Sequence, residues 1–578
     1  MKRSLARMII LLVGMVSCIK GYAQDIEQVL KAEPLRLSGG LTLSNIISLP
    51  EDSSGYTHTY SYYLSGSLNT TLMGLVSVPI SFAYTNNKLT STVAFPFNRF
   101  SLTPTYKWVK LHIGYSQMTF SPYTMSGRDF MGGGIELTPP DMPWLFSAYF
   151  GRYNKAVVRD SVNMEPMYKR LGGGVKVGYK NKKIELMLNA TLAKDVEKSL
   201  TFAEEVDTTY ISPKSNIAIG GSVKLEPWER TTIIGEYAVS IVNNNSKEDS
   251  TGYKPSFFDE DVNITRFQAG KVSVSHRFES ASLGTSYERV SPNYKSFSSY
   301  YNTNDFENIT IDFGMTVADK VNADLNVGMQ RDNLSNQEVN TSSQLIYSCN
   351  MGVNATEQLS ANASISNIQS YVHIKDILDR VTQTNQYQNL DTLSFTELSF
   401  SASASVSYRW GEGEDKAMSH SINTSYGYQK ASHEQENSQR FVNNKLHNCN
   451  INYQLSHRPT KINGTVGVNY NVNKTPEVET KVLTLSAVIG TTIVDKVRTT
   501  LSFNYSDVKT FERSNIINTR FSASYSFLKY HSLNCSLTIL SKDVRESKIQ
   551  LSANITYNLS LDYVLKKRIK REDKQNFM

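Results

Sequence analysis

Apolar and polar residues alternate along much of the chain, and the alternation is clearest near the C-terminus. In residues 551–563 every second position is Leu, Ala, Ile or Tyr, and the positions between carry Ser, Asn, Thr or Asp. The same period of two runs through 461–473. Successive side chains of a β-strand point to opposite faces, so each segment is predicted to be a strand with one apolar and one polar face. Asn463-Gly464, a common hairpin pair, lies inside the alternation and is interpreted as strand.

The length of these runs separates a membrane protein from a soluble β-sandwich. Strands of soluble proteins are typically about 5–6 residues long. Runs of about ten residues or more match strands that cross a bilayer at a tilt. Applied to the whole chain, the pattern predicts about 26 strands, the first beginning near Leu35 and the last ending near Leu565.

The connections between the predicted strands fall into two alternating classes. The long, polar ones are 86–99, 118–129, 154–168, 194–213, 243–261, 290–304, 331–340 and 371–389. The tight ones are Met73-Gly74, Lys107-Trp108, Lys180–Lys182, Glu226–Glu229, Ala318-Asp319, His457–Thr460 and Leu528–Tyr530. Outer-membrane barrels have short periplasmic turns and longer extracellular loops. We therefore expect both termini in the periplasm.

In lipid every backbone N–H and C=O needs a partner within the structure, so an open sheet edge is not tolerated. The predicted fold class is all-β: a single large closed antiparallel transmembrane β-barrel over residues 35–565. Its apolar stripes would contact outer-membrane lipid, and its Asn, Ser, Thr and Gln stripes would line a wet lumen.

The N-terminus resembles a cleaved export signal. Lys2, Arg3 and Arg7 precede a short apolar run, and Gly21 and Ala23 are small residues suited to a cleavage site after residue 23. The apolar run is shorter than the about 20 residues of a membrane-spanning helix. Lipidation at Cys18 is the alternative. Residues 1–23 are thus predicted as signal peptide, 24–34 as a short periplasmic segment, and 566–578 as a basic periplasmic tail.

Composition and charge narrow the function further. The chain has 33 Tyr and 24 Phe but only 4 Trp, and this composition favours β-strands. Its mean hydropathy of −0.35 argues against a helical membrane protein. The predicted signal peptide contains four of the 60 basic residues, Lys2, Arg3, Arg7 and Lys20. The remaining 56 basic residues nearly balance the 53 acidic ones, and this even charge indicates no nucleic-acid partner.

We find no convincing catalytic or metal-binding pattern. Gly172-Gly173-Gly174 lies inside a strand pattern and lacks the helix and the Gly-Lys-Ser/Thr of a nucleotide loop. The nine histidines are dispersed, without a close pair that would hold a metal. Cys349, Cys449 and Cys535 are widely scattered. We therefore expect no enzyme, no metal and no cofactor.

The region 95–155 carries the densest local information. Its motifs are Pro96-Phe97-Asn98, Tyr106-Lys107-Trp108, Gly114-Tyr115-Ser116, Phe120-Ser121-Pro122-Tyr123-Thr124 and Gly132-Gly133-Gly134. In these motifs the chain resembles large outer-membrane proteins of Bacteroidetes-type Gram-negative bacteria, a group without a settled biochemical role. The resemblance implies location in the cell outer membrane. The chain looks unlike TonB-dependent receptors, because strands that begin near Leu35 leave no room for a plug domain.

The segment 118–134 has two interpretations. In the first it is an inward-folded loop, stiffened by Phe120 and Tyr123, with Arg128 and Asp129 presenting charge at a constriction. In the second it is an extracellular loop packed on the barrel rim, and the triple glycine allows close approach of strands. The sequence favours the second.

Barrel size directs the functional prediction. Barrels of 22 strands already need a plug, and no separate plug domain is visible here. We expect a pore or conduit for passage of a substrate across the outer membrane, closed by inward loops or by a protein partner. The alternative is a structural barrel that anchors or displays a surface partner through loops such as 243–261 and 371–389.

Overall fold

The computed structural model describes fifteen stretches of the chain. They are residues 34–49, 60–86, 99–157, 166–200, 211–246, 264–299, 304–332, 334–335, 343–367, 400–411, 417–433, 442–493, 496–528, 530–543 and 547–565. The expected signal peptide, Cys18, the tail 566–578 and the loop 371–389 lie outside these residues. Within them, no helix is long and apolar enough to cross a membrane.

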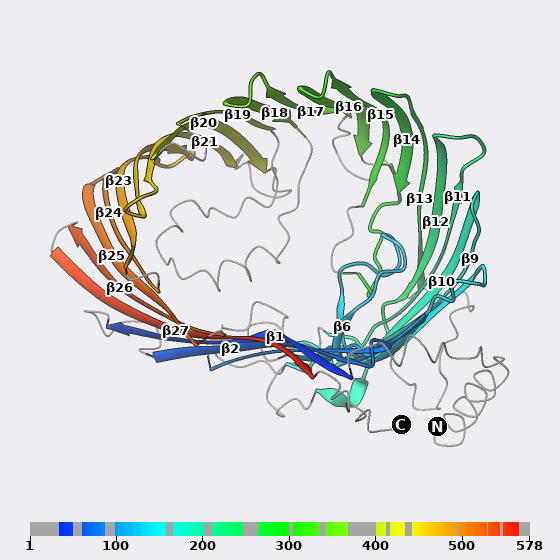
Figure 1. The fold of residues 1–578 in the computed structure, drawn as a ribbon. Helices are drawn as coiled ribbons and strands as arrows, with labels where there is room; N and C mark the ends of the chain where they lie inside the picture. The colour runs from blue at the N-terminus through cyan, green and yellow to red at the C-terminus, as the bar shows by residue number, and fades with distance from the viewer. Residues whose placement is uncertain are drawn as a thin grey trace, which may run out of the picture.

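The strands follow one another in a ring (Figure 1). The first third comprises β1 (Leu35–Leu49), β2 (Tyr60–Leu72), β3 (Val76–Thr85), β4 (Arg99–Leu102), β5 (Thr105–Tyr106), β6 (Val109–Gln117), β7 (Asp129–Leu137), β8 (Trp144–Asn154), β9 (Arg170–Lys180) and β10 (Ile184–Asp195). A short 3-10 helix, η1 (Glu197–Ser199), then precedes β11 (Ser215–Leu225), β12 (Thr231–Asn243), β13 (Ile264–Arg277), β14 (Ala281–Val290), β15 (Phe306–Val317), β16 (Val321–Asp332), β17 (Ser343–Asn354) and β18 (Leu359–Ser366). The ring continues through β19 (Phe400–Trp410), β20 (Met418–His433), β21 (Val442–His457), β22 (Ile462–Lys474), β23 (Glu479–Ile493), β24 (Val497–Lys509), β25 (Arg513–Phe527), β26 (His531–Asp543) and β27 (Ser547–Leu565).

The sheet closes on itself without an edge. The first strand, β1, pairs with β2 on one side and with the last strand, β27, on the other, so that Leu35 lies opposite both Leu72 and Leu565. Because β4 and β5 both lie between β3 and β6, they count as one wall strand, and the 27 strand segments make a 26-strand antiparallel barrel. The predicted fold class and strand number are confirmed.

The break between β4 and β5 has a simple cause. Pro104 has no N–H to donate to the sheet, and proline is tolerated in sheets mainly at such irregularities. The wall stays hydrogen-bonded across the break, because the Thr103 N–H donates to the carbonyl of Pro79 at 2.9 Å and the Leu111 N–H donates to the carbonyl of Pro104 at 2.8 Å.

The two faces of the wall differ in chemistry as the alternation predicts. Large apolar side chains point outward and are exposed, among them Leu188 (70% exposed), Phe150 (64%) and Val466 (58%). A continuous apolar band of this kind is unfavourable in water and suits lipid. The architecture is therefore that of a transmembrane barrel of the outer-membrane type.

The connections also alternate as predicted. At one end, two-residue turns such as Met73-Gly74 and Ala318-Asp319 have both φ angles positive, which matches the right-handed twist of the flanking strands. Leu35 and Leu565 lie at this same end. The opposite end carries the long connections, although those that follow β22, β24 and β26 are only a few residues long. Asn463-Gly464 lies inside β22, as expected.

Candidate functional site

Two loops fold into the barrel and pack on its inner wall. The first inward loop is residues 118–128, between β6 and β7, and the second is residues 291–299, which follow β14. Figure 1 shows the first loop inside the ring, on the side of β12 and β13. They are the only connections, among the described residues, that contribute to the buried apolar clusters of the lumen.

Long-range hydrogen bonds hold the first inward loop against the wall. The Tyr123 hydroxyl donates to Glu288 Oε1 at 2.7 Å, and Thr124 Oγ1 donates to Asn189 Oδ1 at 2.6 Å. Both acceptors lie on strands, at inward-facing positions. Gly220 on β11 leaves room for this contact, since a Cβ there would lie 2.9 Å from Thr124 Cγ2. The loop therefore reaches the middle of the wall.

The second inward loop is fixed by one buried amide. Asn216, 1% exposed, accepts a hydrogen bond from the Phe297 N–H at 2.9 Å through its Oδ1. Its Nδ2 donates to Ser240 Oγ at 2.7 Å, and Ser240 Oγ donates to the carbonyl of Lys295 at 2.6 Å. Asn216 thereby joins the loop backbone to two strands of the wall.

The two loops also bind each other. The Tyr294 hydroxyl donates to the carbonyl of Tyr123 at 2.7 Å, and Ser296 Oγ donates to the carbonyl of Thr124 at 2.6 Å. A parallel bridge joins Ser126 to Ser299. Side chains of the second loop thus satisfy backbone carbonyls of the first loop that are buried away from water. Leaving such buried carbonyls without a donor would be costly. The pair behaves as one packed unit.

An apolar core lies beneath the loops, inside the barrel. It comprises Met118, Phe120, Met125, Phe130, Tyr149, Tyr153, Ala193, Val242 and Phe297. Glycines on β9 make space for its aromatic rings: a Cβ on Gly172 would lie 2.2 Å from the Tyr153 ring, and one on Gly174 would lie 2.7 Å from the Tyr149 ring. The glycine run 172–174 therefore serves packing, and it lies within a strand as expected.

Three of the four predicted site residues, Phe120, Tyr123 and Arg128, are buried in the packing of the inward loops. Phe120 and Tyr123 are 8% and 7% exposed, and Arg128 is 8% exposed. Arg128 donates to Asn154 Oδ1 at 2.6 Å, and its guanidinium lies 5.2 Å from the centre of the Tyr153 ring. Asp129, the first residue of β7, pairs with Arg99 at 3.1 Å. The interpretation as a rim loop, which the sequence favoured, is wrong; that these residues narrow the pore stays a prediction.

Burial changes the proton affinity of the loop tyrosines. Desolvation raises the pKa of Tyr123 well above its usual range, and the neighbouring Glu288 carboxylate adds to this effect. Burial likewise raises the pKa of Tyr294. Both hydroxyls therefore keep their protons, and act as donors, far into the alkaline range.

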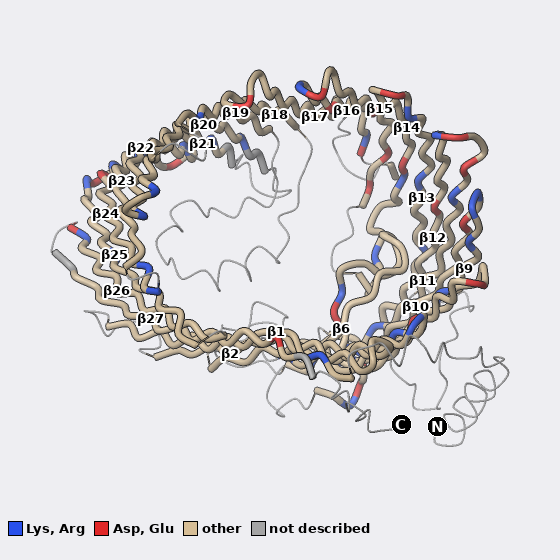
Figure 2. Tube along the Cα trace, in the orientation of Figure 1, with Lys and Arg blue, Asp and Glu red and all other residues tan. Residues whose placement is uncertain are grey.

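The inner wall is charged on the side that carries the loops. Lysine and carboxylate side chains alternate between neighbouring strands there, as in the pairs Lys110–Glu136 at 3.0 Å and Lys271–Glu288 at 3.2 Å. Figure 2 shows acidic and basic residues following one another along β12 to β15. Because the pairs are mixed in sign, this side compensates its own charge.

The opposite side of the lumen is almost free of charge. We call the inner face of β17–β27 and β1–β3 the neutral wall. Its inward positions carry Ser, Thr and Asn that meet across strands, for example Asn423 opposite Asn452 and Asn450 opposite Asn469. In the described part of this wall, Arg520 is the one charged inward side chain more than about three residues from a strand end. Amides and hydroxyls therefore dominate here.

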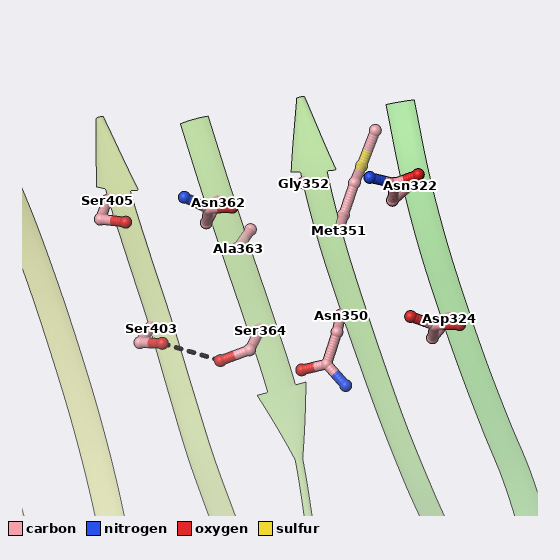
Figure 3. A pocket seen from close by; sticks show the side chains of 10 residues that line it. All are labelled: Asn322, Asp324, Asn350, Met351, Gly352, Asn362, Ala363, Ser364, Ser403 and Ser405. Atoms are coloured by element: carbon pink, nitrogen blue, oxygen red, sulfur yellow. Dashed lines mark hydrogen bonds between the residues drawn. The ribbon is translucent and has the colours of Figure 1, made fainter. Parts of the chain in front are cut away.

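A hollow of about 290 Å³ lies where the charged side meets the neutral wall (Figure 3). Side chains from four adjacent strands line it: Asp324 on β16, Asn350 on β17, Asn362 and Ser364 on β18, and Ser403 on β19. Ser364 and Ser403 share a hydrogen bond of 2.7 Å. The hollow offers one carboxylate among neutral donors and acceptors. The described residues contain no group of three or more His, Cys, Asp or Glu placed to hold a metal ion.

Sequence reasoning missed the residues that anchor the loops. Asn189, Asn216, Glu288 and Tyr294 carry no local motif, and the partners Tyr123 and Glu288 are 165 positions apart. The first three occupy ordinary inward positions of strands, and they differ from dozens of similar residues only in what the fold places opposite them. No signal in a single sequence marks them.

Comparison with known proteins gives no close relative. No family model matches the chain, and no curated protein sequence is detectably similar to it. Solved structures with related strand arrangement include OccAB4 of Acinetobacter baumannii, with 8% identity over 92% of this chain and 99% of that one and a TM-score of 0.31. The siderophore receptor PirA of Pseudomonas aeruginosa has 11% identity over 91% and 80%, with a TM-score of 0.35. A mutant Rh. blastica porin has 10% identity over 58% and 94%, with a TM-score of 0.24. Likenesses this distant carry no argument about function.

Proposed function

We propose that the protein is an outer-membrane pore or conduit through which a polar substrate passes. One observation carries the proposal: the described inward loops are anchored on one side of a 26-strand barrel, and a polar wall lines the other side. A barrel of about 16–18 strands already encloses an aqueous channel. In the part of the chain that the structure describes, the loops that pack in the lumen lie along one side, which leaves room for passage along the other.

The proposal includes orientation and closure. The short turns and both termini would face the periplasm, as in outer-membrane barrels generally. The inward loops would form part of the closure, with Phe120, Tyr123, Arg128 and Asp129 in the packed unit at the pore. We also propose that a protein partner completes the closure of the pore, bound either in the lumen or at the extracellular loops. Barrels of 22 strands already contain a plug.

The sequence motifs of 95–155 support the placement of this chain among the large Bacteroidetes-type outer-membrane proteins. Its separation from TonB-dependent receptors is part of the same proposal. We further propose that the protein acts without catalysis, because neither the sequence nor the packing of the inward loops suggests a nucleophile beside a base.

Planar-bilayer conductance of the purified full-length protein tests the pore, alone and after gentle extraction from native membranes. We expect discrete conductance steps with weak preference between cations and anions, because the neutral wall carries few charges and the opposite side compensates its own. A matched test compares wild type with Tyr123→Phe. The substitution removes the hydroxyl that donates a hydrogen bond to Glu288, and it should increase current fluctuations.

A barrel that stays sealed under every condition, with and without its partner, would contradict the pore. Co-purification of a stoichiometric surface protein with such a sealed barrel would instead support the anchoring role.

A further inference from the structure

The neutral wall is chemically uniform in a way that restricts what it can bind. Most of its inward side chains are amides and hydroxyls, and they bond to one another across strands, such as Asn448 Nδ2 to Asn471 Oδ1 and Thr484 Oγ1 to Ser506 Oγ at 2.9 Å. Each amide has two donors and an acceptor with two lone pairs, and each hydroxyl one donor and two acceptor sites, so these pairings leave capacity directed at the lumen.

The wall offers little to charged or apolar solutes. A path for ions or phosphates would show rows of like charge, as selective pores do. In the described part of this wall, Arg520 is the one charged inward residue at mid-strand. An extended polypeptide would present side chains of both signs and apolar groups. The described wall holds one mid-strand charge on its inward face, and its inward apolar residues Val482, Val508 and Leu540 are buried. The hydroxyls of a neutral, hydroxyl-rich molecule can both donate to and accept from the amides and hydroxyls of this wall.

The hollow at the edge of this wall adds a place to bind. About 290 Å³ is near the lower end of ligand pockets, roughly 300–1,000 Å³, and suits one or two sugar rings rather than a folded partner. Asn350 and Asn362 project into it from neighbouring strands, and Asp324 supplies a carboxylate acceptor beside them (Figure 3). Acceptors and donors alternate over adjacent strands, spaced about 4.8 Å apart. Vicinal hydroxyls of a sugar ring can bridge such a row.

We propose that the hollow is a binding subsite for a neutral carbohydrate, and that the neutral wall is the surface along which the carbohydrate chain moves. The proposal rests on the proposed pore function for its second half only, since binding in the hollow does not require conduction. Asn350, Asn362, Ser364 and Ser403 donate to and accept from the sugar hydroxyls, and Asp324 accepts from a pair of them.

Equilibrium dialysis of the full-length protein in detergent against radiolabelled maltohexaose tests binding without reference to conduction. We expect saturable retention that an equal concentration of polyethylene glycol of similar size does not compete away. In Asn350→Leu/Asn362→Leu, which keeps side-chain size but removes both amides, the affinity should fall about tenfold or more, because two hydrogen bonds are lost. Gln330→Leu, at an inward position of β16 outside the hollow, is the matched control and should bind as wild type.

The outcomes separate the two proposals. No saturable retention, equal retention by the double variant, or tighter binding of an uncharged Ser/Gly peptide would overturn the carbohydrate subsite, whatever the conductance. Saturable, variant-sensitive binding to a barrel that never conducts would support the subsite and contradict the pore. In a conducting barrel, maltohexaose should also interrupt the current, with interruptions at least several-fold shorter in the double variant.

Discussion

Replacing Asn216 with alanine should release the second inward loop while leaving the barrel intact. The substitution removes the acceptor of the Phe297 N–H, at 2.9 Å, and the donor to Ser240 Oγ, at 2.7 Å. Asn216 is 1% exposed, so the groups left behind are shielded from water by the surrounding protein. A buried polar group without a partner costs about 1–3 kcal/mol, whereas a satisfied hydrogen bond contributes about 0.5–1.5 kcal/mol net.

Orphaning the Phe297 N–H and losing the bond to Ser240 therefore sum to about 1.5–4.5 kcal/mol. At about 1.4 kcal/mol per factor of ten, the equilibrium for local opening of residues 291–299 should shift by about 10- to 1,500-fold. The barrel itself should stay intact, because β11 is held to β10 and β12 by backbone pairing and not by the Asn216 side chain.

Amide hydrogen exchange, followed by mass spectrometry in detergent micelles, measures this opening directly. Peptides covering 291–299 should lose protection by about the factor given above. Peptides covering 118–128 should lose less, because Tyr123 and Thr124 keep their own bonds to the wall. The control is Asn362→Ala, an exposed inward Asn of the neutral wall, which should leave both loops protected. Unchanged exchange of 291–299 in Asn216→Ala would refute the role of this amide, and equal loss in the control would show that the effect is not specific.

Three further predictions follow from the same contacts. Gly220→Val should displace the first inward loop and raise channel conductance, because a Cβ at this position would lie 2.9 Å from Thr124 Cγ2. The control Gly427→Ala, whose Cβ would have its nearest neighbour at 4.0 Å, should conduct as wild type. Equal conductance in the two variants would contradict the packing of the loop. Leu188→Arg, on the lipid face, should destabilise the barrel by about 2–4 kcal/mol in urea titrations in vesicles, and Ser486→Arg, on the lumen face, should cost much less; similar costs would contradict the assignment of faces. Since the pKa of Tyr123 is raised, its contribution to anchoring the loop is complete below the usual tyrosine pKa of about 10 and is lost only as the pH rises through the raised value. The ultraviolet titration curves of native Tyr123→Phe and native wild type should therefore coincide near pH 10. If wild type ionised one more tyrosine than the variant at that pH, the Tyr123 ring would be solvated.

Closure of the barrel follows from local information. The alternation of apolar and polar residues repeats within each strand, and the period of two alone decides which residues face lipid. The tight turns and long connections then fix the order of hairpins, and 26 strands with the first at Leu35 and the last at Leu565 are found as predicted. Within the described residues, the sequence also placed Asn463-Gly464 and Gly172–Gly174 correctly in strands.

The position of the inward loops could not be predicted in the same way. Residues 118–128 have no periodicity that separates a rim loop from one folded inside, and the rim interpretation was wrong. The contacts that decide the matter join Tyr123 to Glu288 and Asn216 to Phe297, pairs that are 165 and 81 positions apart. Each is an ordinary residue of its own segment.

The sequence by itself therefore determined a closed, membrane-spanning barrel and the chemistry of its two faces, because both depend on the alternation of side chains along single strands. Only the tertiary structure decided that two loops pack as one unit against the charged side of the lumen, and that a polar hollow borders the neutral wall. The physical reason is curvature: closing the ring brings inward side chains of distant strands onto one concave surface, and burial there depends on which of them meet.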